Sequence, residues 1–188
     1  ENTILDNNKN YEYYILNKPK GVVSTASDDL GRKTVVDLID TRTRIYPVGR
    51  LDYDTTGLLL LTNDGVLANK LMHPSSNIYK TYVARVDGIV KGYDIKRLKD
   101  GVMIDGVKTA KCHVKLKSVD AKKEKSIVEL TIHEGKNHQV KKMFESLGYR
   151  VSKLKREKYA NMDLTGLKTG EYRKLSNKEI AVLYSLIK

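Results

Sequence analysis

The stretch Ile45-Tyr-Pro-Val-Gly-Arg-Leu-Asp-Tyr-Asp-Thr-Thr-Gly-Leu-Leu-Leu-Leu-Thr62 places a polar loop between two apolar, extended segments. Residues 45–48 and 58–62 have the composition of buried strands, and the loop Gly49–Gly57 joins them. Loops positioned by buried strands often carry the functional residues of a fold. Asp52 lies between the two glycines, where a carboxylate beside a cation can act as a nucleophile or a base. The alternative is an aspartate that only stabilises its own turn.

Outside this stretch the sequence alternates between strand-like and helix-like segments. Further strands are expected at residues 11–16, 22–25, 78–86, 112–119 and 126–133. Helices are expected at residues 34–39, 66–73, 93–99 and 138–147, and a capping box at Ser176 and Glu179 begins a last helix that ends at Ile187. Hairpin-like strand pairs with interspersed helices indicate the α+β class, with a mixed, largely antiparallel sheet.

The chain has 188 residues and a net charge of +12, and this charge is unevenly distributed. Residues 1–65 contain 8 Lys and Arg against 10 Asp and Glu, whereas residues 66–188 contain 27 against 13. Such a basic chain indicates a polyanionic partner such as a nucleic acid, because each cation near a phosphate displaces a bound counterion. The alternative is a lysine-rich face that only meets solvent. Residues 133–160, with 8 Lys and Arg against 3 acidic residues, are expected to line the path of the phosphates.

Several classes of protein are excluded by the sequence. No Walker-type phosphate loop, Gly-x-Gly-x-x-Gly turn or Gly-x-Ser-x-Gly motif is present. His133 and His138 are one residue too far apart for two zinc ligands on one helical face, so no metal or cofactor is expected. The single Cys112 excludes an internal disulfide framework and favours a reducing compartment, the cytoplasm. The longest apolar run, Leu58–Leu61, is far too short to span a membrane.

Two further segments contain side chains that either belong to the core and the solvated surface or form part of a site. In Lys80-Thr-Tyr82, the tyrosine ring either belongs to the core or is presented to a nucleic-acid base. The segment Glu134-Gly-Lys-Asn-His-Gln-Val-Lys-Lys-Met-Phe144 contains the pair Lys141 and Lys142, which is either a solvated helix face or part of a site. Taken one at a time, neither segment decides between these alternatives.

Taken together, the segments resemble the bacterial ribosomal-RNA pseudouridine synthases of the RsuA/RluB family. The resemblance covers residues 13–183, and its motifs in chain order are Lys18-Pro-Lys-Gly21, Tyr46-Pro-Val-Gly-Arg-Leu-Asp52, Gly57-Leu-Leu-Leu-Leu-Thr-Asn-Asp-Gly65, Lys80-x-Tyr82 and Glu134-Gly-x-Asn-His-Gln-Val140. It implies the pseudouridine synthase fold, a long bent sheet with flanking helices and a central basic cleft. It also implies isomerisation of a chosen uridine in RNA, with base flipping and without a metal or cofactor.

The resemblance also assigns roles to individual residues. Asp52 corresponds to the catalytic aspartate and Tyr82 to the tyrosine that packs against the target base. Lys141, with Lys142 as second choice, corresponds to the basic partner of the aspartate. The chain carries lysine where the family usually has arginine at positions 136, 141 and 142, and Tyr159-Ala160 where Ile-Gly is common. The residues expected to contact RNA are Arg50, Lys136, Asn137, His138, Gln139, Lys142, Lys155 and Arg156.

The same resemblance suggests the domain organisation and the substrate. Residues 1–10 are expected to be a linker of the kind that follows an N-terminal S4 domain, and residues 11–188 a monomeric catalytic domain. Tyr53 and the stretch Met72-His73-Pro74 resemble the large-subunit branch, so 23S rRNA is favoured over 16S rRNA as the RNA partner. Two alternatives are a ribosome-assembly factor that binds RNA without chemistry and a basic DNA-binding module. The intact Arg50-Leu-Asp52 argues against the first, and the lack of a helix-turn-helix or zinc knuckle argues against the second.

Overall fold

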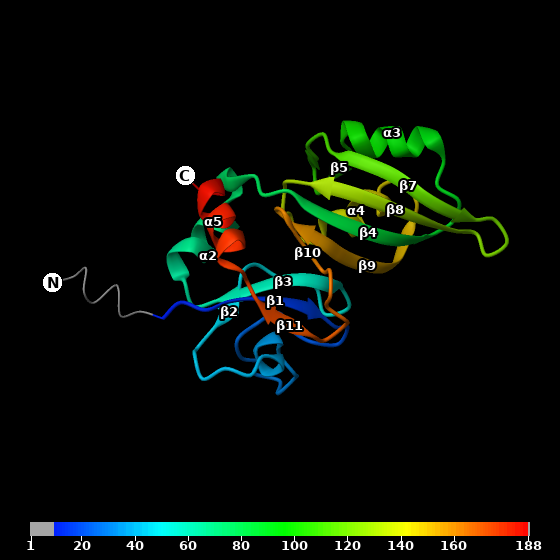
Figure 1. Ribbon diagram of the computed structural model, residues 1–188. Helices are drawn as coiled ribbons and strands as arrows, with labels where there is room; N and C mark the ends of the chain where they lie inside the picture. Colours follow the sequence, from blue (N-terminus) through cyan, green and yellow to red (C-terminus); the bar gives the residue numbers. More distant parts are fainter. Residues whose placement is uncertain (1–9, 188) are drawn as a thin grey trace.

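A nine-stranded sheet runs through the computed structural model, which describes residues 10–187 (Figure 1). Its main path, in spatial order, is β11 (Tyr172–Lys174), β1 (Tyr13–Lys18), β3 (Thr56–Thr62), β9 (Arg150–Tyr159), β4 (Lys80–Asp87), β8 (Lys125–Ile132) and β7 (His113–Asp120). The short strands β2 (Tyr46–Pro47) and β10 (Met162–Asp163) pair with β3 and β9, and β5 (Met103–Ile104) forms a separate ribbon with β6 (Val107–Lys108). All these pairs are antiparallel except β3 with β9. The expected α+β class with a mixed, mostly antiparallel sheet is therefore confirmed.

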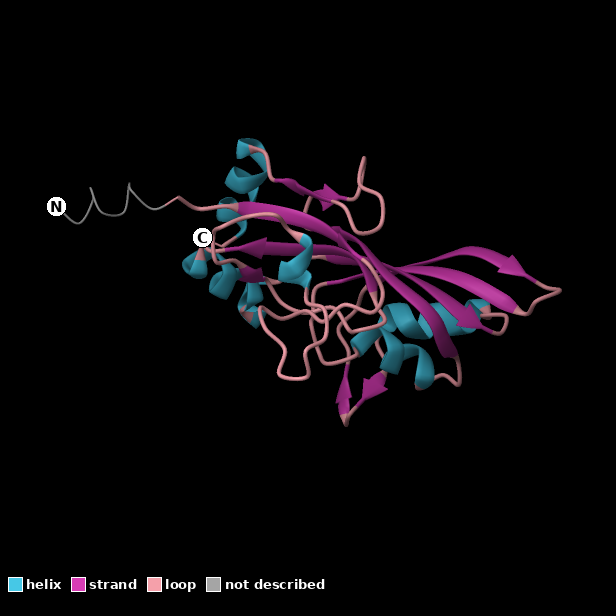
Figure 2. Ribbon diagram, turned by 90° about the horizontal axis from the view of Figure 1, so that it is seen from below, coloured by secondary structure: helices cyan, strands magenta, loops and turns pink. Residues whose placement is uncertain are grey.

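Helices cover the two halves of the sheet separately. α3 (Gly92–Asp100) and α4 (Gln139–Glu145) pack on the half that contains β4, β8 and β9. α2 (Gly65–Met72) and α5 (Asn177–Leu186) pack on the half that contains β1 and β3, and the 3-10 turn η1 (Val35–Leu38) covers its other face. A second 3-10 turn, η2 (Pro74–Ser76), follows α2. Figure 2 shows the sheet twisting where the two halves meet.

The uninterrupted leucine run of β3 is explained by the central position of this strand. Leu58 and Leu60 point into the core under α2 and α5, whereas Leu59 and Leu61 point into the core under η1. All four are at most 3% exposed, and each buried side chain of this size contributes about 1.5–3 kcal/mol. A strand buried on both faces therefore anchors the polar loop that precedes it.

The helices predicted from apolar spacing and capping signals are observed to within two residues. In α4 the stripe Val140, Met143 and Phe144 is at most 3% exposed, as the spacing predicts. At the start of α5, Glu179 N–H donates to Ser176 Oγ at 3.2 Å, and Ser176 N–H donates to the Glu179 carboxylate at 2.8 Å. The capping box expected from the sequence is thus confirmed.

The strand expected at residues 22–25 is wrong. Val23 forms only an isolated bridge with Thr34, in which Val23 N–H donates to Lys33 O and Val35 N–H donates to Val23 O. Thr25 N–H then donates back to Val23 O, so the segment turns away before a strand can extend. Of residues 45–48, only Tyr46–Pro47 form a strand, and beyond it Val48 N–H still donates to Leu60 O of β3 at 2.7 Å.

The linker predicted at residues 1–10 lies, apart from Asn10, outside the described residues, so the domain boundary stays a prediction. Within residues 10–187, no helix is long and apolar enough to cross a membrane.

Candidate active site

The parallel pairing of β3 with β9 brings the polar loop to the middle of the sheet. Thr56 pairs with Lys155, and Gly57 pairs with Arg156. No side chain fits at Gly57, because a Cβ atom would lie 2.1 Å from the Arg156 carbonyl oxygen and the backbone φ is +113°. The glycine at the end of the loop therefore permits the close approach of the two strands that join the halves of the sheet.

A buried lysine at the end of β1 supports the loop. Lys18 Nζ donates to the carbonyl oxygens of Pro19 (3.0 Å), Tyr53 (3.3 Å) and Thr55 (2.7 Å). The side chain is fully buried, and this burial lowers the pKa of Lys18 to about 8, although nearby carboxylates act in the opposite direction. The ammonium group thus fixes the loop backbone on both sides of its second aspartate. The Lys18-Pro-Lys-Gly21 motif predicted the family, but not this role.

Asp52 is in contact with side chains at the start of α4. His138 Nδ1 lies 2.8 Å from Asp52 Oδ2, and Lys141 Nζ lies 3.5 Å from the same oxygen. His138 has a left-handed backbone (φ 53°) and precedes the first residue of α4. Lys141 makes a shorter contact, 2.9 Å, with Asp54 Oδ1. One ammonium group therefore bridges both aspartates of the loop.

The contact of Lys141 with the two aspartates shifts the pKa values of Lys141 and Asp54. Burial acts to lower the pKa of Lys141, but the hydrogen bond to Asp54 and the charges of Asp54 and Asp52 outweigh it, so the pKa is raised. The same hydrogen bond lowers the pKa of Asp54. Lys142 instead contacts Asp105 at 2.5 Å, in an exposed pair. Of the two candidate lysines, the structure brings Lys141 to Asp52.

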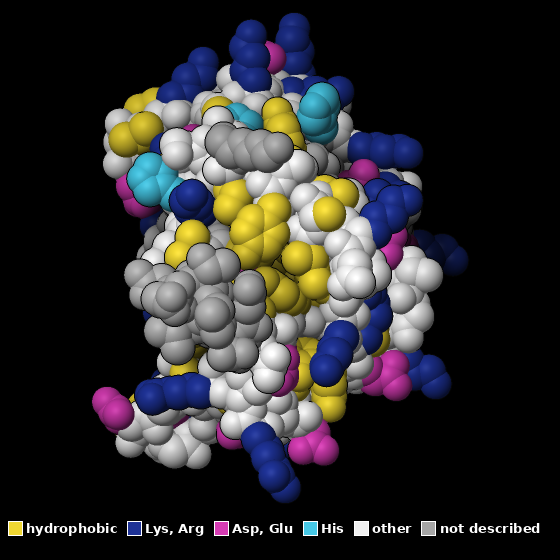
Figure 3. Space-filling view, turned by 60° about the vertical axis from the view of Figure 1, so that its left-hand side comes forward, with side chains coloured by type: hydrophobic (Ala, Val, Ile, Leu, Met, Phe, Trp, Pro, Cys, Tyr) yellow, Lys and Arg dark blue, Asp and Glu magenta, His cyan; other side chains and the backbone are white. Residues whose placement is uncertain are grey.

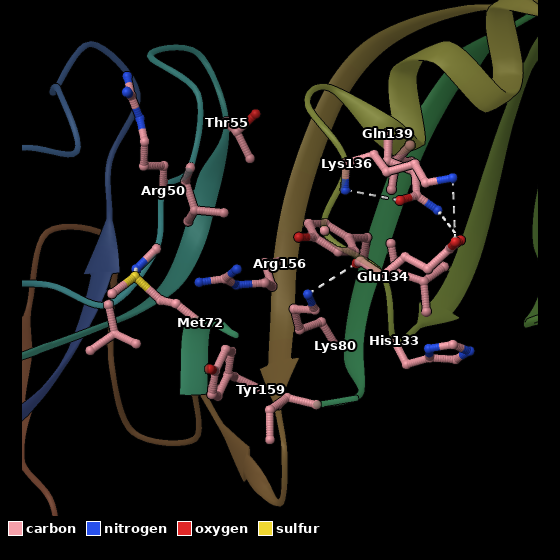
Figure 4. Close-up of a pocket in the computed structure, with 18 of the residues that line it drawn as sticks. Arg50, Thr55, Met72, Lys80, His133, Glu134, Lys136, Gln139, Arg156 and Tyr159 are labelled. Atoms are coloured by element: carbon pink, nitrogen blue, oxygen red, sulfur yellow. Dashed lines mark hydrogen bonds and ion pairs between the residues drawn. The ribbon is translucent and has the colours of Figure 1, made fainter. Parts of the chain in front are cut away.

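A cleft of about 780 Å³ opens between the two halves of the molecule (Figure 4). Asp52 and the half-buried Tyr82 both line it. It is also lined by five of the eight predicted RNA-contact residues, which are Arg50, Lys136, His138, Gln139 and Arg156. The other three, Asn137, Lys142 and Lys155, lie outside its lining. The expected central basic cleft is therefore present.

Gln139 uses both ends of its amide within the protein. Lys136 N–H donates to Gln139 Oε1 at 3.1 Å, and Gln139 Nε2 donates to Glu134 Oε1 at 2.9 Å. Ala110 N–H donates to the same carboxylate oxygen at 3.0 Å. With 4% of its surface exposed, Gln139 shapes the wall of the cleft from which Lys136 projects.

Two further cleft residues were not singled out as site residues from the sequence. Lys80 Nζ donates to Glu134 O at 3.0 Å, and burial, together with the charge of Arg156, lowers the pKa of Lys80 to about 8. Tyr159 is 5% exposed, and its ring centre lies 5.2 Å from Arg156 Cζ. Lys80 and Tyr82 are two residues apart and therefore share one face of β4, so the position of Lys80 in the cleft could have been predicted from that of Tyr82. The position of Tyr159 depends on the register of β9 and could not.

Similarity to solved structures defines the class of protein to which this fold and cleft belong. A crystal structure described as a pseudouridylate synthase matches with a TM-score of 0.84 at 33% identity, over 93% of this chain and 74% of that chain. Human RNA pseudouridylate synthase domain containing 1 shares the fold at 15% identity, with a TM-score of 0.58 over 95% of this chain and 92% of that chain. The molecule is thus built as a pseudouridine synthase.

Sequence comparison agrees with this class. The model of the RNA pseudouridylate synthase family matches residues 12–146, and the chain belongs to this family of RNA isomerases. The Bacillus subtilis (strain 168) protein "Ribosomal large subunit pseudouridine synthase B" is 54% identical over 93% of this chain and 72% of its own length. The Escherichia coli (strain K12) protein "Dual-specificity RNA pseudouridine synthase RluF" is 38% identical over 92% of this chain and 57% of its own length. The family resemblance predicted from the motifs is confirmed.

Proposed function

We propose that this enzyme isomerises a uridine of 23S rRNA to pseudouridine, with Asp52 as the catalytic group. The observation that carries the proposal is the contact of Asp52, which lines the basic cleft, with His138 and Lys141. The similarity to the B. subtilis large-subunit enzyme supports 23S over 16S rRNA. A ribosomal substrate and a single cysteine favour a cytoplasmic enzyme, which we expect to act as a monomer.

The target uridine has to leave its stack before its ribose can reach Asp52, at a cost of a few kcal/mol. Arg50, two residues before Asp52 and also in the cleft lining, is placed to help displace the base. Tyr82 offers a ring on which the extruded base stacks, which returns about 1–3 kcal/mol. The free-energy cost of flipping the base and the free energy gained by stacking it are therefore of similar magnitude, so the cleft can hold the extruded base.

Asp52 then attacks the ribose, or removes a proton from it, while the bond from C1′ to N1 breaks. The electron pair of this bond passes to the uracil, which turns and joins C1′ through C5. At this step the bond that Asp52 formed with C1′ breaks or, if Asp52 removed a proton, that proton returns to the ribose. The hydrogen on C5 leaves as a proton, and N1 gains one, so the reaction is an isomerisation. His138 and Lys141 fix the direction of the Asp52 carboxylate during these steps.

Positive charge on the surface supports binding of the remaining RNA. In Figure 3, Lys and Arg side chains project around the margin of the face shown, and an apolar area occupies its centre. Exposed basic residues of β9, such as Lys153 and Lys158, belong to the segment expected to follow the phosphates. We expect the affinity for RNA to fall steeply as salt is added, and a flat salt titration would count against this path.

Release of tritium from rRNA labelled at C5 of uridine tests the role of Asp52. Asp52→Asn is expected to retain RNA binding and lose turnover, because an amide is neither a useful base nor a useful nucleophile. Asp29→Asn, which removes an equal charge from an exposed residue, is the matched control and should be fully active. Turnover at the wild-type rate by Asp52→Asn would remove Asp52 from the reaction.

Mapping of pseudouridines in rRNA from cells that lack the protein tests the substrate. We expect one or more modified positions to be missing from 23S rRNA and none from 16S rRNA. A loss confined to 16S rRNA would overturn the large-subunit assignment while leaving the enzyme class intact.

A further inference from the structure

A bulge in β9 determines which of its side chains face the cleft. The pairing with β4 is regular up to Thr81 opposite Lys158, and then shifts so that Tyr82 lies opposite Arg156. Glu157 is the extra residue, and without the bulge it would lie opposite Tyr82. Because a one-residue shift turns a side chain to the other face of a sheet, the bulge places an arginine beside the tyrosine where a carboxylate would otherwise lie.

Arg156 has hydrogen-bond donors that the protein does not use. Nε donates to Leu58 O at 2.9 Å, but Nη2 is buried without a hydrogen-bond partner among the described residues. The residue is 4% exposed, yet it lines the cleft, and Figure 4 shows its side chain reaching from β9 into the space between the two halves. A buried charged donor without a partner is costly, which is typical of a group reserved for a ligand.

We propose that Arg156 is a specificity-determining residue that donates a hydrogen bond to O4 of the extruded uracil. The inference rests on the proposed function. Directly opposed residues of antiparallel strands have their Cβ atoms about 4.5–5.5 Å apart, so a base stacked on Tyr82 extends over Arg156. The C4 atom of uracil lies across the ring from N1, so the edge farthest from the ribose carries O4. Asp52, which acts on the ribose, has a side chain 30% exposed, and Arg156 lies deeper.

The chemistry of the guanidinium group discriminates between the two pyrimidines. It carries only donors, and these match O4 of uracil, which is an acceptor. In cytosine the same position carries an amino group, so two donors would face each other. The electron pair released when C1′–N1 breaks places negative charge on the uracil oxygens, so the same contact strengthens during the reaction.

A phosphate is the other acceptor that an arginine commonly binds. The surroundings of Arg156 favour the base, because the cleft lining near it includes Ile78, Leu154 and Tyr159, which suit a flat ring. A phosphate of the RNA backbone would instead keep its solvation at the exposed lysines of β9. A hydrogen bond from Arg156 to the base and an ion pair of Arg156 with a phosphate predict different outcomes in the following experiment.

The experiment measures binding of a 23S rRNA fragment that spans the mapped target, with Asp52→Asn in every variant to prevent turnover. We expect the fragment with uridine to bind about 10- to 100-fold tighter than the fragment with cytidine, as for a hydrogen bond to a charged donor. Adding Arg156→Met should bring this ratio close to one. Lys158→Met, which alters an exposed lysine of the same strand, is the matched control and should leave the ratio unchanged.

A ratio that Arg156→Met leaves unchanged would overturn the inference, as would an equal loss of affinity for both fragments, which a phosphate contact predicts. Thermal unfolding shows whether the variant is folded, and Arg156→Lys, which keeps the charge, provides a second variant with an intermediate ratio expected. Replacement of the target uridine by 4-thiouridine tests the same contact with Arg156 intact, and equal affinity would also overturn it. Tritium release by the wild-type enzyme is measured in parallel, because its absence would instead refute the proposed function.

Discussion

Lys18→Met tests whether a buried ammonium group holds the loop Gly49–Gly57. In the folded protein this group satisfies the carbonyl oxygens of Thr55, Pro19 and Tyr53 at 2.7, 3.0 and 3.3 Å. Each buried carbonyl oxygen left without its hydrogen-bond donor costs about 1–3 kcal/mol. Methionine offsets part of this cost, because the variant no longer has to bury a charged group. We expect the free energy of unfolding to fall by about 3 kcal/mol. For a chain of this size, such a loss lowers Tm by roughly 6–12 °C.

Urea titration and thermal unfolding measure this loss, and tritium release from labelled rRNA measures its effect on the site. Tyr53 and Thr55 follow Asp52 in the same loop, so loss of their contacts with Lys18 should displace Asp52. We therefore expect kcat to fall well below that of the wild type at temperatures where the variant is folded. Lys33→Met, at an exposed position, is the control and should change stability by less than about 0.5 kcal/mol. A Lys18→Met variant as stable as this control would refute the reasoning.

Three other perturbations have outcomes that the structure determines. Gly57→Ala should cost well over 3 kcal/mol or prevent folding, since its Cβ would clash with β9 at a positive φ, whereas Gly49→Ala, whose Cβ would meet nothing within 4 Å, should cost about 1 kcal/mol in a urea titration. Lys141→Met should lower kcat about 100-fold in the tritium assay, whereas Lys141→Arg should retain most of the activity because arginine keeps the charge. A Lys141→Met variant as fast as the wild type would contradict the role of Lys141. Hydrogen bonds from Arg173 lower the pKa of Glu179 from 4.5 to about 2, so its carboxylate stabilises the fold above pH 4.5 and this contribution is lost as the pH falls toward 2. The stability difference between wild type and Glu179→Gln should shrink over that range, and a constant difference would count against the ion pair.

The bulge in β9 shows where prediction from local sequence ends. The segment Leu154-Lys-Arg-Glu-Lys-Tyr159 has no alternation that marks Arg156 and Tyr159 as neighbours on one face, since they are three residues apart. Only the pairing with β4 places both in the cleft. The choice between Lys141 and Lys142 was likewise open until the helix was placed beside the Asp52 loop.

The sequence by itself determined the features that depend on near neighbours in the chain. The apolar run after Gly57, the stripe of α4 and the capping box of α5 each follow from spacing or from a side chain that bonds its own backbone. The motifs from Lys18 to Val140, taken together, were also sufficient to place the chain among the pseudouridine synthases.

Tertiary structure alone decided which side chains meet in the site. Asp52 and His138 are separated by 86 residues, and Lys18 reaches carbonyl groups up to 37 residues away. The approach of the two halves depends on the parallel register of β3 with β9, and the face on which Arg156 lies depends on the bulge in β9. Neither leaves a pattern in the local sequence. A strand register is fixed by the packing of both faces of the whole sheet, so it cannot be read from one segment at a time.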